Sequence, residues 1–236
     1  PSLMYDTTSW NKVFRTDFWR EAGLSFEPQV TYEDLPVMIA AHVRARSVDV
    51  LKAPVYWWRR RIDADASITQ RRGELANLRD RMDAIAKVED LLADDEFLRR
   101  THDRKVLTFD IPLYLPYYAQ ADEQYQRLFL ERVGAFVAGV APEVMAELPP
   151  RDRVRYWLIQ QGRSADLLEF LEFERDPYAV RRTVPADGVT YADLPFLGEP
   201  GYPMDLYAWG KAQPVASEVE RVAWTEEGLF VAGYAY

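Results

Sequence analysis

Three groups of polar residues have side-chain types and spacing that could support chemistry. In chain order they are Asn11-Lys12, Glu33-Asp34, and Trp57-Trp58-Arg59-Arg60-Arg61 leading to Ser67-Ile68-Thr69. A carboxylate can act as a general base, and arginine with hydroxyl groups can stabilise a developing negative charge. Each group is therefore a candidate for acid–base or anion-binding chemistry.

Each group also has an explanation without chemistry. Acidic residues in a first helical turn usually complement the helix dipole and cap backbone amides. Consecutive arginines commonly form a solvated surface, on which neighbouring aromatic rings pack against their stems. His42 and His102 are expected to be surface or core residues, and the tyrosines from Tyr114 to Tyr118 are expected to pack between helices.

The composition excludes several classes of protein. The 236 residues are 48% hydrophobic and 28% charged, which predicts a folded chain of one large or two modest domains. The absence of cysteine excludes disulfides, zinc–thiolate sites and thiol catalysis. A net charge of -9 disfavours nucleic-acid binding, and no apolar run is long enough to span a bilayer.

The elements expected to position the first two groups include both helices and strands. Aromatic residues precede a short helix expected from Thr16, and a second helix is expected from Thr31 toward Arg46, with Thr31 as its N-cap. Strands are expected at Val48–Leu51 and Val55–Trp58, on either side of a kink at Pro54. The polar segment that follows, to Gln70, is expected to be a loop.

The middle of the chain has helical periodicity throughout. A long amphipathic helix is predicted from Glu74 to Arg100 with a break near Asp94-Asp95. Further helices are predicted near residues 103–119, 122–140, 150–161 and 164–175, the last with Ser164 as N-cap.

After Asp176-Pro177, closely spaced prolines and glycines predict an irregular segment, and the last residues predict a β-hairpin with its turn at residues 225–228. The predicted fold class is therefore mixed α/β followed by mostly α, with a C-terminal linker and hairpin. The domains expected are residues 1–72, 73–183 and 184–236. Because the chain starts without Met and stops within an expected strand, we expect a fragment of a larger protein.

The ordered set of motifs in the first 72 residues resembles family 2 glycosyltransferases, which are inverting enzymes of the GT-A fold. The motifs are Trp10-Asn11-Lys12-Val13-Phe14-Arg15, Phe18, Gly23-Leu24-Ser25-Phe26, Tyr32-Glu33-Asp34-Leu35-Pro36, Ala53-Pro54-Val55-Tyr56-Trp57-Trp58-Arg59-Arg60-Arg61 and Ser67-Ile68-Thr69. The resemblance covers the C-terminal, acceptor-side half of the catalytic domain. The helical block and Tyr191–Gly198 are similar to multidomain actinobacterial enzymes that join such a transferase to a teichoic-acid-type glycerophosphotransferase.

The resemblance implies a role for each group. Asp34 would be the general base, and Glu33 would orient the acceptor or the base. A mobile loop with Arg59, Arg61, Ser67 and Thr69 would bind the donor diphosphate, whereas Asn11 and Lys12 would follow a strand end on the acceptor side.

The resemblance also implies partners and a cofactor. The donor would be a nucleotide sugar, and the acceptor a glycan or polyol phosphate of a cell-surface polymer. A divalent metal, Mg²⁺ or Mn²⁺, would have its Asp-x-Asp ligands outside this chain, because Asp63-Ala64-Asp65 follows the catalytic carboxylate where the family motif precedes it. The fragment alone is expected to be inactive. The expected location is the cytoplasm, with peripheral association at the inner face of the plasma membrane left open.

One hypothesis of another class stays open beside the enzyme fragment. Amphipathic helices with many aromatic residues would also suit a non-catalytic interaction or assembly module, including a homo-oligomer.

Overall fold

The computed structural model describes residues 2–54, 56–57, 71–176, 182–209, 217–225 and 228–235. The helices are α1 (Thr16–Glu21), α2 (Asp34–Arg44), α3 (Leu75–Leu91), α4 (Glu96–Lys105), α5 (Leu115–Tyr118), α6 (Glu123–Gly139), α7 (Pro142–Glu147), α8 (Pro150–Gln160) and α9 (Ser164–Phe173). The strands are β1 (Thr183–Ala186), β2 (Val189–Ala192), β3 (Ser217–Thr225) and β4 (Gly228–Ala235). The described residues are therefore mixed α/β and mostly helical, as the sequence predicts.

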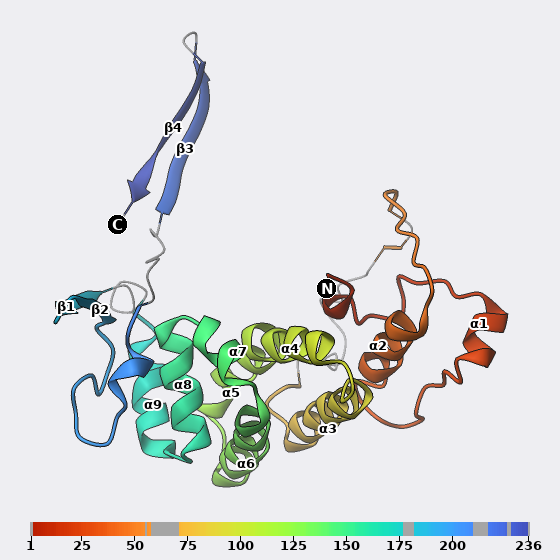
Figure 1. Ribbon diagram of the computed structural model, residues 1–236, viewed down its shortest axis with the longest axis horizontal. Helices are drawn as coiled ribbons and strands as arrows, with labels where there is room; N and C mark the ends of the chain where they lie inside the picture. The colour runs from red at the N-terminus through yellow and green to blue at the C-terminus, as the bar shows by residue number, and fades with distance from the viewer. Residues whose placement is uncertain are drawn as a thin grey trace.

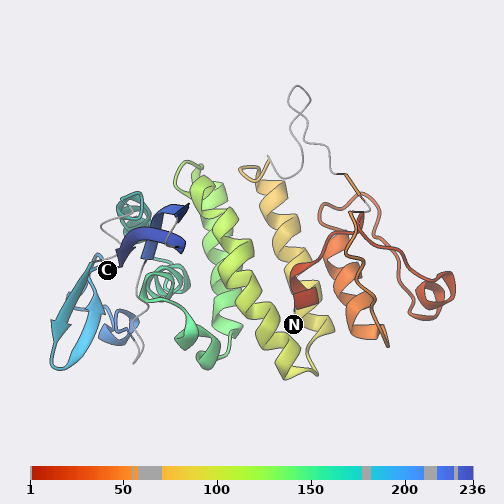
Figure 2. The same cartoon turned by 90° about the horizontal axis from the view of Figure 1, so that it is seen from above.

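The helices pack side by side along the long axis of the molecule. Helix α2 contacts α3, α3 contacts α6, α6 contacts α8, and α8 contacts α9 (Figure 1). Figure 2 shows the same succession from above, with α1 at one end of the row and the β1–β2 hairpin at the other. One large hydrophobic core extends through this row, and a smaller core lies between α1 and α2.

The long amphipathic helix predicted from Glu74 is confirmed, together with its break. Leu78, Ile85 and Val88 of α3 are buried at helical spacing. The helix ends at Leu91, and α4 begins after Asp95, whose side chain accepts a hydrogen bond from the Leu98 amide at 3.0 Å. The break therefore coincides with an N-cap.

The predicted helix over residues 103–119 is not continuous. After α4 the backbone widens into a π-helical segment, Val106–Asp110 (η3), then tightens into a 3-10 turn, Ile111–Leu113 (η4), before α5. Pro112 and Pro116 lack an amide hydrogen, so each is accommodated only in the first turn of a new element, η4 and α5 respectively. This irregular segment carries the buried carboxylate Asp110.

Helix α6 has a side-chain cap whose contribution can be measured. Asp122 accepts a hydrogen bond from the Tyr125 amide at 2.9 Å. We expect Asp122→Ala to lower the free energy of unfolding by about 1 kcal/mol, because one amide of the first turn loses its acceptor. Urea denaturation measures the change, with Gln124→Ala in the same turn as the control. An equal loss in both variants would contradict a capping role.

Two predicted N-caps are wrong. Helix α2 begins at Asp34 rather than at Thr31, because Tyr32 adopts a left-handed backbone (φ 66°) that interrupts helical geometry before Glu33. Ser164 is the first residue of α9, after Arg163, and its hydroxyl lies 2.8 Å from the Tyr118 hydroxyl instead of capping the helix. In both cases tertiary contacts decide the local conformation.

The strand predicted at Val48–Leu51 does not form in the described part of the chain. The segment is exposed and has no strand beside it, and a β-strand needs a neighbour to satisfy its backbone groups. Of the second predicted strand, Val55 and Trp58 lie outside the described residues.

The C-terminal region contains more regular structure than the sequence predicts. Strands β1 and β2 pair through the turn at Asp187-Gly188, where both residues have positive φ (50° and 77°), as a tight two-residue hairpin requires. Ala192, Leu194 and Tyr207 are buried in the large core, so this segment packs on the helices.

In the helical part of the chain, α7 is a further element that the sequence does not predict.

The predicted terminal hairpin is confirmed. Strands β3 and β4 pair antiparallel from Thr225 and Gly228 outward, with an irregularity between Val219 and Arg221. Figure 1 shows this hairpin extending away from the helices. Apolar residues on both strands, including Val222, Trp224 and Phe230, are exposed.

Candidate functional site

Glu33 and Asp34 stand at the start of helix α2, which packs into a hydrophobic core on each of two sides. Leu35 and Ile39 of α2 belong to the large core, whereas Val37 and Met38 belong to the smaller one. Because α2 is held by both cores, the position of its first turn is fixed by packing. Asp34 and Glu33 are both half-buried at that turn.

The surroundings of Asp34 favour its protonated form. Burial is the largest cause and raises the pKa of Asp34, and the neighbouring charge of Glu33 raises it further. The charge of Arg81 and the amides of Asp34 and Leu35 oppose this effect, but the resulting pKa still lies above the ordinary value of 3.8. A carboxylate with a raised pKa is a better proton acceptor, which suits a general base.

The turn that carries Glu33 and Asp34 is called the acidic turn below. A cavity of about 230 Å³ lies beside it, between α2 and α3. Pro36, Val37 and Ala40 of α2 give it an apolar wall. Its polar lining comprises Ser25, Glu27, Tyr32, Glu33, Arg44, Asp83 and Lys87. Glu33 therefore faces a hollow with both apolar and charged groups, whereas Asp34 does not line it.

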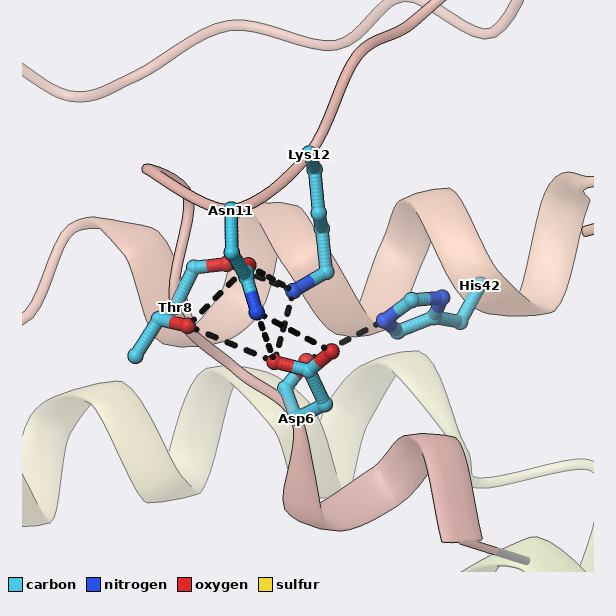
Figure 3. Close-up of polar contacts among 5 residues, drawn as sticks. All are labelled: Asp6, Thr8, Asn11, Lys12 and His42. Carbon is cyan, nitrogen blue, oxygen red and sulfur yellow. Dashed lines mark hydrogen bonds and ion pairs between the residues drawn. The ribbon is translucent and has the colours of Figure 1, made fainter. Parts of the chain in front are cut away.

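Asn11 and Lys12 belong to a separate polar cluster centred on Asp6 (Figure 3). Lys12 Nζ donates to Asp6 Oδ1 at 2.8 Å and to the Thr8 carbonyl at 2.6 Å, and Asn11 Nδ2 donates to Asp6 Oδ1 at 3.1 Å. His42 Nε2 lies 3.1 Å from the Asp6 carbonyl oxygen. Asp6 was not identified from the sequence, because no spacing relates it to the other residues.

The structure does not bring this cluster to Asp34. His42 lies eight residues after Asp34 on α2, which corresponds to roughly 12 Å along the helix axis. Asn11 lies in a turn and Lys12 in the chain that follows it, and no strand precedes them among the described residues. Their side chains instead hold the segment between η1 (Ser2–Tyr5) and α1.

Lys12 can be tested through the titration of Asp6. Burial alone would raise the pKa of Asp6, but the hydrogen bonds from Lys12 and Asn11 and the Lys12 charge outweigh it, so the pKa is lowered from 3.8. The cluster therefore contributes stability above pH 3.8 that is lost as the pH falls through the lower folded pKa. We expect Lys12→Met to raise the pKa of Asp6, as measured by carboxyl NMR. Lys52→Met, on an exposed segment, is the control, and an unchanged Asp6 titration in Lys12→Met would contradict this assignment.

The predicted diphosphate-binding residues Arg59, Arg61, Ser67 and Thr69 lie outside the described residues.

A buried ion cluster that the sequence analysis missed lies behind the acidic turn. Asp110 Oδ2 accepts from Lys105 Nζ at 2.9 Å, and Asp110 Oδ1 contacts the Arg81 guanidinium. The exposed side-chain fractions are 0% for Asp110, 1% for Lys105 and 11% for Arg81. The sequence contains no signal for this cluster, because three charges on amphipathic segments are ordinarily solvated.

Arg81 also contacts the residue that shapes the acidic turn. Its guanidinium carbon lies 4.8 Å from the ring centre of Tyr32. The Tyr32 hydroxyl donates to Asn77 Oδ1 at 2.9 Å, and the Tyr114 hydroxyl lies 2.9 Å from that of Tyr32. Side chains of α3 and of the segment before α5 therefore hold the chain two residues before Asp34.

His102 is a core residue, which is one of the two environments expected for both histidines. It is fully buried, and burial is the main cause that lowers its pKa from 6.5. His42 is half-buried.

Within the described ranges, no group of three or more His, Asp or Glu residues could hold a metal ion. No helix among the described residues is long and apolar enough to cross a membrane.

The helical part of the chain matches a known family model. Residues 72–171 match the model of the glycosyl transferase TarS linker domain. This range extends from the residues just before α3 nearly to the end of α9, so it includes Arg81 and Asp110 but not the acidic turn. The match supports a protein related to glycosyltransferases.

Solved structures of one such enzyme share the fold. The crystal structure of S. aureus TarS 1–349 in complex with UDP-GlcNAc is 15% identical with a TM-score of 0.56, covering 89% of this chain and 58% of that chain. The structure of S. aureus TarS 1–349 is 13% identical with a TM-score of 0.50, covering 84% and 53%. This chain thus spans little more than half of each structure. No curated protein matches the sequence.

Proposed function

We propose that this chain is the acceptor-side part of an inverting glycosyltransferase of the GT-A fold, family 2. The observation that carries the proposal is the half-buried carboxylate of Asp34, held at the start of a doubly anchored helix in a fold shared with S. aureus TarS. The ordered sequence motifs around this turn support the same assignment.

In the proposed reaction, Asp34 accepts the proton of an acceptor hydroxyl. The hydroxyl oxygen forms a bond to the anomeric carbon of the donor sugar, and the bond from that carbon to the nucleoside diphosphate breaks on the opposite face. The electron pair leaves with the diphosphate, so the anomeric configuration inverts. Positioned proton transfer of this kind contributes about 10²–10⁴-fold to the rate.

The other site residues have supporting roles in this proposal. Glu33, which lines the cavity between α2 and α3, orients the acceptor. Arg59, Arg61, Ser67 and Thr69 bind the donor diphosphate and stabilise its charge as it leaves. Asn11 and Lys12 act on the acceptor side only through the segment that they hold together with Asp6.

For substrates, we propose a nucleotide-sugar donor and a glycan or polyol-phosphate acceptor. The donor class is supported by the TarS structure, which contains UDP-GlcNAc. Synthesis of a teichoic-acid-like cell-surface polymer in the cytoplasm, at the inner face of the plasma membrane, would suit these substrates. The resemblance implies that the ligands of a divalent metal lie outside this chain, and within the described residues no group of three or more His, Asp or Glu side chains could hold one.

The proposal is tested by assaying the full-length protein that contains this chain. Nucleoside diphosphate release should require both a nucleotide sugar and a polyol-phosphate polymer, and NMR of the product should show an inverted anomeric configuration. The isolated chain should release none. Retained configuration, or no transfer from any nucleotide sugar tested, would refute the proposal.

A second candidate function is favoured by the terminal hairpin. Strands β3 and β4 expose apolar side chains on both strands, including Trp224, which is 81% exposed. Such a surface suits an assembly module. Under this alternative the chain should show a mass that rises with concentration and falls on Trp224→Ser. A monomer at every concentration would refute it.

A further inference from the structure

The buried ion cluster behind the acidic turn has an excess of positive charge. The single carboxylate of Asp110 faces two cations, Lys105 and Arg81, and all three side chains are largely removed from water. One carboxylate cannot neutralise both, and a buried uncompensated charge is costly. A further anion near the cluster would therefore be stabilising.

Asp34 is an anion whose charge reaches this cluster. Its charge interacts with that of Arg81 and with that of Lys105. Arg81 lies on α3, at the side of the helical block that packs against α2. The excess positive charge of Arg81 and Lys105 therefore acts on the start of α2, which carries the proposed general base Asp34.

Arg81 also has a mechanical connection to the same turn. Its guanidinium stacks on the Tyr32 ring at 4.8 Å, and Tyr32 is the residue whose φ of 66° redirects the chain into α2. The hydroxyl of Tyr32 is held by Asn77, which lies one turn before Arg81 on α3. Because Asp110 also contacts the guanidinium, Arg81 connects a buried anchor to the acidic turn.

We propose that Arg81 is a positioning residue for Asp34, clamping the Tyr32–Asp34 turn and placing positive charge near its carboxylate. The helical block that matches the linker model would then be part of the catalytic centre rather than a spacer. The catalytic consequence rests on the proposed function, whereas the effect on Asp34 itself does not.

The electrostatic part of the proposal has a defined direction. Burial and Glu33 raise the pKa of Asp34, and Arg81 with the helix-start amides lowers it. The Lys105 ammonium acts in the same sense as Arg81. Removing the Arg81 charge should therefore raise the pKa of Asp34 and leave less of the ionised base at neutral pH.

The test compares two substitutions of Arg81 with a control on the same helix. Arg81→Met removes the charge and keeps the stem, Arg81→Lys keeps a charge without the planar clamp, and Arg79→Met changes an exposed arginine. Carboxyl NMR on this chain follows the titration of Asp34. Transfer assays on the full-length protein give kcat, KM and their pH profiles.

We expect Arg81→Met to raise the Asp34 pKa and to lower kcat. The acidic limb, which is the part of the pH profile where kcat falls at low pH, should move to higher pH. The fall in kcat should reach about 10²-fold, the cost of misplacing a catalytic group by roughly 1 Å. The donor KM should change little. Arg81→Lys should lower kcat while the acidic limb stays in place, and Arg79→Met should behave as the wild type.

An unchanged Asp34 titration in Arg81→Met would overturn the proposal whatever the activity. If Arg81→Met does not fold, full kcat in Arg81→Lys would overturn it, because the clamp would then be dispensable. A raised Asp34 pKa in Arg81→Met, combined with a fully active Asp34→Asn enzyme, would support the positioning effect and refute the proposed function.

Discussion

Replacing Asp34 by Asn is expected to lower kcat for sugar transfer about 10²–10⁴-fold, the contribution of a positioned general base. The substitution preserves the size of the side chain and its place at the start of α2. It removes the ability to accept a proton from the acceptor hydroxyl. Initial rates of nucleoside diphosphate release from the full-length protein measure the effect.

The pH profile separates a base from a merely structural carboxylate. Because the pKa of Asp34 is raised from 3.8 by burial and by Glu33, wild-type kcat should fall as the pH drops through a value above 3.8. That limb should be missing in Asp34→Asn. Asp17→Asn, which alters an exposed acid in the first turn of α1, should leave both rate and profile unchanged. An Asp34→Asn enzyme with wild-type kcat would refute the assignment of Asp34 as base.

Replacing Asp110 by Asn is expected to destabilise the chain by about 3–5 kcal/mol, the cost of leaving a buried charge without its partner. Lys105 and Arg81 would both lose their carboxylate, at exposed fractions of 1% and 11%. Chemical denaturation monitored by tryptophan fluorescence measures the change. No comparable loss should follow substitution of an exposed acid such as Asp94.

The cause of this loss can be isolated with a second substitution and with pH. Lys105→Met combined with Asp110→Asn should recover part of the stability, because one stranded cation is removed. Burial is the largest cause that lowers the pKa of Lys105 from 10.5, Asp110 and Asp34 oppose it, and Arg81 adds to it. In Asp110→Asn the folded pKa falls further, so stability should rise with pH as Lys105 loses its proton in the folded state first. A loss that is independent of pH would contradict this account.

The helical order of the middle of the chain could be predicted because it depends on local patterns. The apolar spacing of α3 and the polar break before α4 are properties of short windows of sequence, and core packing reinforces both. The β3–β4 hairpin was predicted for the same reason. The β1–β2 hairpin had a local signal in Asp187-Gly188, which the surrounding prolines and glycines obscured.

Elements that depend on distant partners could not be predicted. The segment Val48–Leu51 has strand-like residues but no neighbouring strand among the described residues. Thr31 and Ser164 have the side chains of N-caps, yet Tyr32 and Tyr118 engage in contacts that place the helix starts elsewhere. Cap propensity is worth about 1 kcal/mol, which a few tertiary contacts can outweigh.

The sequence by itself determined that the chain is mostly helical, that Glu33 and Asp34 stand at a helix start, and which family their order resembles. These conclusions need only residue type and spacing. The tertiary structure alone decided that Asn11 and Lys12 bind Asp6 away from Asp34, and that Arg81, Lys105 and Asp110 form a buried cluster behind the acidic turn. Burial is the physical reason. A charge removed from water is costly unless it is paired, and the groups that pair with it are its neighbours in space rather than in sequence.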